Sequence, residues 1–137
     1  MRLDDYLKER NIPEDSLEAN SIREGFALAL KTFRSIPKTL NIGGQPIEVK
    51  IVERGDDNCL GHCRVAQGCI EIAEKYDRNK NISEGCKLNT FYHELTHAIL
   101  YTMGENELDN NEKFVCAFSS FLTEALTTLR YDFNERN

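Results

Sequence analysis

The sequence contains no tryptophan, only three histidines and no apolar run long enough to cross a bilayer. A membrane-spanning helix needs about 20 consecutive apolar residues, so an integral membrane protein is not expected. Residues 1–10 are polar and lack the apolar core of a secretion signal. The five cysteines form an odd set. Without a secretion signal, such a set predicts free thiols in a cytoplasmic protein.

Basic residues are also scarce. The chain has 17 lysines and arginines against 23 aspartates and glutamates, a net charge of −6. A surface that binds nucleic acid directly would be basic, so neither nucleic acid nor an anionic membrane is an expected partner. The hydrophobic content of 40% and charged content of 29% are ordinary for a globular protein. A chain of 137 residues suits one core, so we expect a single domain over residues 1–137.

The most informative segment that is present is H-E-x-x-H at residues 93–97. On a helix, positions i and i+4 lie on the same face, so His93 and His97 can bind one metal ion together. Glu94 lies one step round the helix, where its carboxylate can reach a water molecule beside the metal. Two ligands, an open coordination position and a general base are the arrangement of a zinc hydrolase.

The surrounding residues predict that this segment is helical and packed. Ser83 can cap the start of a helix, and Gly104 suits its end. Apolar residues recur between them at spacings of three and four, which is typical of an amphipathic helix. These residues are Leu88, Phe91, Leu95, Ile99 and Met103.

A catalytic zinc site usually has a third protein ligand. The extended metzincin motif needs glycine and histidine at positions where this chain has Leu100 and Met103, so that class is excluded. A second amphipathic helix is predicted from about Asn110 to Tyr131, with Glu112 in its first turn. A carboxylate there can simply pair with the helix dipole, but we favour Glu112 as the third ligand. Three carboxylates of the connecting loop are alternatives: Glu105, Glu107 and Asp109.

Residues 91–100 and 112–118 together resemble the small gluzincin metallopeptidases of the ImmA/IrrE-like kind. The resemblance implies a minimal zincin-like fold, one Zn²⁺ held by His93, His97 and Glu112, and Glu94 as the catalytic base. It also implies a regulatory protease of the type found in phages and mobile elements. The chain departs from the family at Thr96, where glycine is common.

We therefore expect a zinc metalloendopeptidase that hydrolyses peptide bonds of a protein or peptide substrate. A zinc-stabilised protein-binding module without turnover is the alternative, and an amidase acting on other substrates is a third possibility. Three residues are candidates for stabilising the oxyanion: His62, Tyr92 and Tyr101.

A second metal site is conceivable because Cys59, His62, Cys63 and Cys69 lie within eleven residues. In a strand, however, Cys59 and Cys63 would lie on one face and His62 on the other. We therefore favour free buried thiols over a second zinc.

The remaining patterns predict an α+β fold. Two N-terminal helices, at Leu3–Glu9 and from Ser21 to about Ser35, precede two hairpins. The first hairpin joins strands 39–42 and 45–52 through Gly43-Gly44, and the second joins strands 62–66 and 69–73. A small, mostly antiparallel sheet results, followed by the H-E-x-x-H helix packed on a C-terminal helix.

Overall fold

The computed structural model describes residues 3–55, 58–77 and 80–130, and the side chains of all of these except 26–32. Contacts divide the chain into two units, and Ile36–Leu126 forms the unit that carries the H-E-x-x-H segment. No helix within the described ranges combines the length and the apolar character needed to cross a membrane.

The other unit contains helices α1 (Leu3–Glu9) and α2 (Leu17–Thr32). The first has the predicted bounds, but the second begins four residues earlier than Ser21, the predicted start. The reason is a different cap: the Ser16 hydroxyl accepts a hydrogen bond from the backbone N–H of Ala19 at 3.1 Å.

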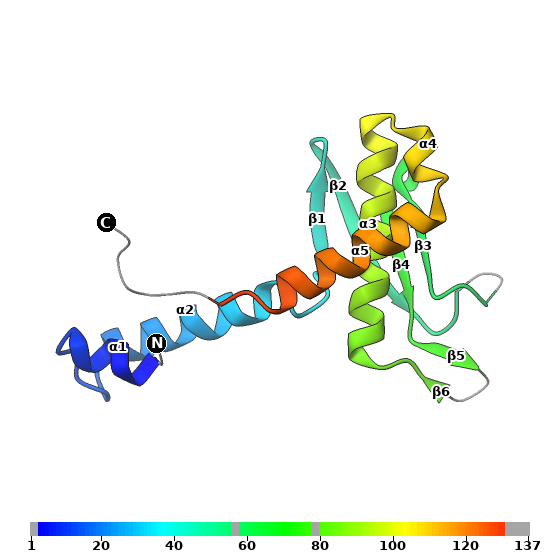
Figure 1. The fold of residues 1–137 in the computed structure, drawn as a ribbon. Coiled ribbons are helices and arrows are strands. Elements are labelled where there is room, and N and C mark those ends of the chain that lie inside the picture. The colour runs from blue at the N-terminus through cyan, green and yellow to red at the C-terminus, as the bar shows by residue number, and fades with distance from the viewer. Residues whose placement is uncertain (1–2, 56–57, 78–79, 131–137) are drawn as a thin grey trace. The chain divides into compact units, whose positions relative to one another are not determined.

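The unit formed by Ile36–Leu126 contains a four-stranded sheet (Figure 1). Its strands lie in the order β1-β2-β4-β3 and comprise Thr39–Ile42 (β1), Gln45–Val52 (β2), Gly61–Arg64 (β3) and Cys69–Ala73 (β4). Both predicted hairpins are confirmed as antiparallel pairs. Gly43 and Gly44 have φ values of 58° and 80°, as a tight two-residue turn requires. The pairing of β2 with β4 is parallel, so the sheet is mixed, which neither hairpin pattern could reveal.

Helix α3 (Glu84–Met103) carries the H-E-x-x-H segment and packs on one face of this sheet. Both predicted ends are confirmed: the Ser83 hydroxyl accepts from the N–H of Cys86 at 3.2 Å, and Gly104 ends the helix with a φ of 78°. The core joins Leu88 and Phe91 to strand residues such as Ile70. The predicted apolar stripe is wrong at its C-terminal end, where Ala98 and Leu100 are the buried residues instead. Ile99 is 39% exposed and Met103 65% exposed.

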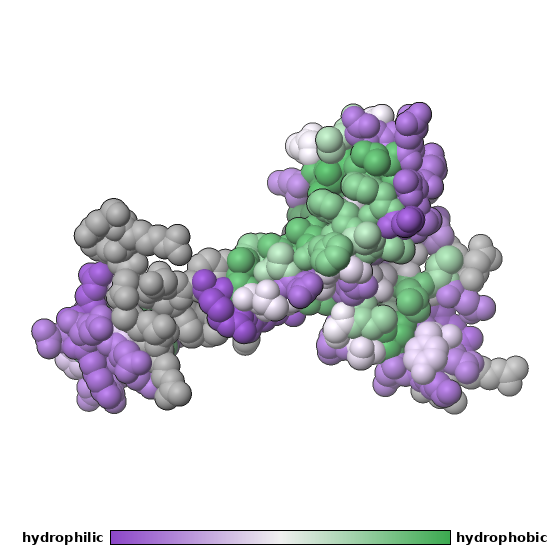
Figure 2. All heavy atoms as spheres, viewed as in Figure 1, coloured by the Kyte–Doolittle hydropathy of each residue, from purple (hydrophilic) through white to green (hydrophobic). Residues whose placement is uncertain are grey.

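The connection after α3 contains a short helix, α4 (Asn106–Asp109), and leads into α5 (Glu112–Thr127). Val115 of α5 is fully buried, and Leu122 and Leu126 pack against the core. Tyr131, the predicted end of this helix, lies outside the described residues. Phe118 and Phe121 remain 48% and 72% exposed. Figure 2 shows an apolar surface in the region of α5.

Smaller elements complete the unit. A 3₁₀ turn (Val65–Gln67) joins β3 to β4. The short strands β5 (Lys75–Asp77) and β6 (Lys80–Asn81) pair with each other.

Candidate metal centre

His93 and His97 lie one helical turn apart on α3, and their rings meet edge to face with centroids 4.9 Å apart. Their outer nitrogens meet the same carboxylate. Nε2 of His93 lies 3.4 Å from Oε2 of Glu112, and Nε2 of His97 lies 3.0 Å from Oε1. Glu112 therefore contacts both of the histidines that were selected with it from the sequence.

Glu112 is held at this point by the start of α5. It is the first residue of the helix, and Asn111 caps it by accepting a hydrogen bond from the N–H of Phe114 at 3.1 Å. The buried side chain of Val115 fixes the helix on the core. The Glu112 side chain itself is 65% exposed, so it faces the two histidines from the solvent side of the site.

The inner nitrogens of both histidines have partners of their own. Nδ1 of His97 donates a hydrogen bond to Oδ1 of Asp109 at 2.7 Å. Nδ1 of His93 lies 3.8 Å from the Cys116 sulfur, a weak hydrogen-bond contact. Such partners fix the ring orientation and the tautomer of a metal-binding histidine. Both rings are thus held with Nε2 toward Glu112.

The carboxylates proposed as alternative third ligands differ in their contacts with the histidines. Within the described part of the chain, only Glu112 and Asp109 place a carboxylate oxygen within 4.0 Å of a histidine nitrogen. Asp109 contacts Nδ1 of His97, the ring nitrogen opposite to the one that faces Glu112. Among the described residues, one set of three potential ligand atoms lies within 4.8 Å of one another. These atoms belong to His93, Glu112 and Cys116.

Glu94 is buried beside this cluster, with 8% of its surface exposed. Burial raises the pKa of its carboxyl from 4.5 to about 7; the nearby His97 opposes this rise and the Glu112 charge adds to it. Burial and the neighbouring His97 lower the pKa of His93, which favours the neutral imidazole that a metal ion requires.

The approach of β3 to α3 completes the surroundings of Glu94. A Cβ atom added to Gly61 would lie 2.9 Å from Cγ and 3.0 Å from Oε1 of Glu94, and 2.6 Å from Cγ2 of Thr90. A side chain at this position would therefore require the side chains of Thr90 and Glu94 to shift. In the strand order β1-β2-β4-β3, β3 is one of the two edge strands, so one of its sides is not paired with another described strand of this sheet.

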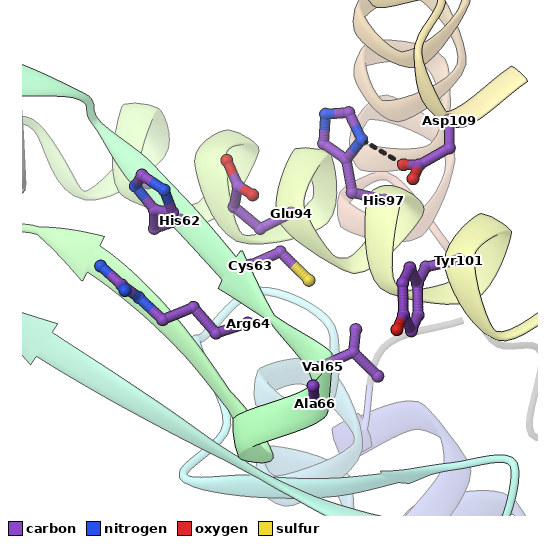
Figure 3. A pocket seen from close by; sticks show the side chains of 10 residues that line it. His62, Cys63, Arg64, Val65, Ala66, Glu94, His97, Tyr101 and Asp109 are labelled. Carbon is purple, nitrogen blue, oxygen red and sulfur yellow. Dashed lines mark hydrogen bonds and ion pairs between the residues drawn. The ribbon is translucent and has the colours of Figure 1, made fainter. Parts of the chain in front are cut away.

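Two cavities of about 410 Å³ each meet at Gly61, Glu94 and His97. Tyr101 lines only the first and Glu112 lines only the second, so we call them the Tyr101 cavity and the Glu112 cavity. The Tyr101 cavity, shown in Figure 3, is bounded by residues 61–66 on one side and by α3 with Asp109 on the other. The Glu112 cavity is lined by residues 59–61, Asn89, Thr90, both histidines, Glu94 and Glu112.

Two of the three candidates for stabilising the oxyanion, His62 and Tyr101, line the Tyr101 cavity together with Glu94. Tyr92 is 4% exposed and belongs to the core, where its ring lies 5.2 Å from that of Phe91. His62 pairs with Glu71 across the strands and so shares the sheet face opposite to α3. Tyr101 lines the Tyr101 cavity, with its hydroxyl directed toward Val65 in Figure 3.

The cysteine-rich segment does not form a second metal site among the described residues. Cys63 pairs with Ile70 and faces α3, whereas Cys69 pairs with Arg64 and lies on the other face of the sheet. All five thiols are free, and only Cys69 is buried. Cys59, expected to be buried, is exposed.

The sequence motifs did not identify two residues that lie at the site, Cys116 and Gly61. Cys116 follows Glu112 by four positions, so the helical period alone places both on one face of α5. Gly61 had a weaker signal, because a glycine beside a strand often marks the close approach of another group.

The contact between Asp109 and His97 leads to a testable prediction. Replacing Asp109 with asparagine removes the charge that holds the His97 ring, and we expect zinc affinity to fall by about 10- to 100-fold. Competition with a chromophoric zinc chelator measures this change. Glu107→Gln, which removes an equal charge from the same short helix α4, is the control. Equal losses in the two variants would show that Asp109 acts only through overall charge.

Comparisons of the chain with protein-family models, with curated proteins and with solved structures find no match.

Proposed function

We propose that this protein is a zinc-dependent metallopeptidase that hydrolyses peptide bonds. The observation that supports this most is the meeting of two imidazole Nε2 atoms on one carboxylate, with the buried Glu94 beside them. The resemblance of residues 91–118 to gluzincins of the ImmA/IrrE-like kind supports the same activity and suggests a regulatory substrate.

The chemistry of the three residues fits a catalytic zinc ion. Two histidines and one glutamate are an established ligand set for such an ion, and three protein ligands leave one coordination position for water. Both imidazoles are oriented through Nδ1 by Asp109 and Cys116. When bound, zinc would supply a Lewis acid that polarises the substrate carbonyl and lowers the pKa of water.

In the proposed mechanism Glu94 is the general base and later the general acid. Its carboxyl group takes a proton as water attacks the peptide carbonyl, and delivers that proton to the departing amine. A pKa of about 7 suits both steps, because the group can accept and release a proton near neutral pH. Burial between α3 and β3 limits exchange of that proton with solvent.

The β3 edge provides a means of binding substrate. An extended peptide can pair with an open strand edge through main-chain hydrogen bonds. The residues of β3, Gly61–Arg64, line the Tyr101 cavity, and Gly61 also lines the Glu112 cavity. A peptide paired with this edge would therefore pass both cavities and cross the position of Glu94.

A ligand-replacement experiment tests the metal assignment. The purified protein is expected to contain close to one zinc ion per chain. Glu112→Ala should reduce this occupancy strongly, because one of three ligands is lost, whereas Glu107→Ala should leave it unchanged. Elemental analysis after gel filtration gives the stoichiometry. A larger loss in the Glu107 variant would contradict the choice of ligand.

Turnover is tested separately by incubating the zinc-loaded protein with the proteome of its host and mapping new peptide termini. New termini that are missing with the Glu94→Gln variant support a peptidase. Full zinc occupancy without any new termini would instead support the alternative, a zinc-stabilised protein-binding module.

A further inference from the structure

We propose that an exposed apolar face of α5 pairs with the same face of a second copy of this chain, with the two helices antiparallel. The face consists of Phe114, Phe118, Phe121 and Ala125, and we call it the α5 seam. The inference goes beyond the proposed function and does not rest on it, because the seam lies on a different side of the helix from Glu112.

The first argument is the exposure of the seam. Phe118 and Phe121 are both exposed, Phe121 at 72%, and the half-buried Phe114 ring stacks on that of Phe118 with centroids 5.7 Å apart. Figure 2 shows apolar surface in the region of this helix. Single apolar residues are common at protein surfaces, but adjoining exposed aromatic side chains indicate a binding surface.

The second argument is the spacing of the seam. Its residues follow one another at intervals of four, three and four positions, which is the repeat that lets two helices pack along their length. Glu112 precedes Phe121 by nine residues, or about two and a half turns, and therefore lies on the opposite side of the helix. A second helix packed on the seam leaves the side of α5 that carries Glu112 uncovered.

The third argument is the placement of two charged residues beside the seam. Lys113 and Glu124 are exposed and eleven positions apart, which is about three helical turns, so they lie along the same side of the helix near its two ends. In an antiparallel pair related by a twofold axis, each Lys113 lies beside Glu124 of the other copy, and opposite charges meet twice. In a parallel pair each of these residues would lie beside its own counterpart, and like charges would meet.

The sizes of the seam residues favour the same direction. With the twofold axis between Phe118 and Phe121, Phe118 packs against Phe121 of the second copy, and Phe114 packs against Ala125. A large side chain thus meets a small one at both ends, as close packing requires. In a parallel pair, Phe114 would meet Phe114 and Ala125 would meet Ala125. A face that matches itself in both charge and size identifies a second copy as its occupant.

Sedimentation equilibrium of the full-length protein over a wide range of concentrations tests this proposal. We expect a monomer of 15.7 kDa in reversible equilibrium with a dimer. Phe121→Ser should weaken the dimer at least about tenfold, because aromatic residues at the centre of an interface contribute much of its affinity. Met103→Ser is the control, since Met103 is 65% exposed on α3 and lies outside the seam, and it should leave the association unchanged.

Charge exchange tests the direction of the pairing. Lys113→Glu and Glu124→Lys should each weaken the dimer by about tenfold, because like charges then meet, and the double variant should restore it. The first substitution adds a negative charge near the start of α5 and the second adds a positive charge in its last turn. Both changes suit the helix dipole, so circular dichroism should show an unchanged helix content.

A protein that stays monomeric at every concentration would overturn the proposal. A dimer that Phe121→Ser leaves intact would also overturn it, since another surface would then hold the two copies. Single charge variants that weaken the dimer without recovery in the double variant would contradict the antiparallel pairing. Zinc content and hydrolysis are measured separately, so failure of this proposal is distinct from failure of the metallopeptidase site.

Discussion

Replacing Glu94 with glutamine is expected to abolish peptide hydrolysis and to stabilise the metal-free protein at pH 8. Glutamine has nearly the same shape but cannot accept a proton, so the loss of the general base should reduce the rate by at least about 100-fold. Zinc should still bind, since both imidazoles and Glu112 are unchanged. Cleavage at the new termini defined above and elemental analysis measure these two effects.

The gain in stability follows from the raised pKa of Glu94. The carboxyl group has an ordinary value of 4.5 in the unfolded chain and about 7 in the folded protein. Between these values the folded state binds the proton more tightly, so stability falls as pH rises through this window. Above pH 7 the buried, ionised carboxylate lowers the free energy of unfolding by its full amount, about 3 kcal/mol. Glutamine is neutral at every pH, so the Glu94→Gln variant does not suffer this loss of stability.

Urea unfolding of the metal-free proteins at pH 4 and pH 8 tests this prediction. The Glu94→Gln variant should match the wild type at pH 4 and exceed it by up to about 3 kcal/mol at pH 8. Glu107→Gln controls for the loss of a negative charge, because Glu107 is exposed on α4. A Glu94→Gln protein that is no more stable than wild type at pH 8 would contradict a buried, neutral carboxyl group.

Replacing Gly61 with alanine is expected to impair both folding and hydrolysis. The backbone of Gly61 is not in the left-handed region, so the effect arises from contacts rather than from backbone strain. The new methyl group would lie 2.6 Å from Thr90 Cγ2 and 2.9 Å from Glu94 Cγ. We expect a loss of about 1–3 kcal/mol in the free energy of unfolding. Hydrolysis should fall about 100-fold, because a small displacement of a catalytic group has that effect.

The double variant Gly61→Ala, Thr90→Ser separates the two contacts. Serine lacks Cγ2 but keeps the hydroxyl that donates to the Cys86 carbonyl at 2.9 Å. Stability should recover in part, while hydrolysis should stay low because the contact with Glu94 persists. Gly85→Ala, in the first turn of α3 with no atom within 4 Å of the new methyl, is the control and should be harmless. Full activity of Gly61→Ala would mean that β3 does not approach Glu94 so closely.

The features predictable from sequence are those fixed by neighbouring residues. Helix α3 has a serine cap, a terminal glycine and an apolar period, and all three act within one or two turns. The Gly43-Gly44 turn determines its hairpin in the same way. The placement of His93 and His97 on one face follows from the helical repeat alone.

The features that sequence could not provide depend on contacts between distant segments. The parallel pairing of β2 with β4 is set by how the two hairpins assemble. The role of Asp109 depends on the short helix α4, which turns its carboxylate toward Nδ1 of His97. The loop position gave no sign of which nitrogen it would reach. The burial of Glu94 depends equally on where β3 lies.

The proposed ligands come from two helices, with His93 and His97 on α3 and Glu112 at the start of α5. An ion bound between them would act as a cross-link that closes the loop formed by residues 98–111. Anything that binds only the folded state stabilises it in proportion to the logarithm of its concentration. The free energy of unfolding would then depend on the concentration of free zinc.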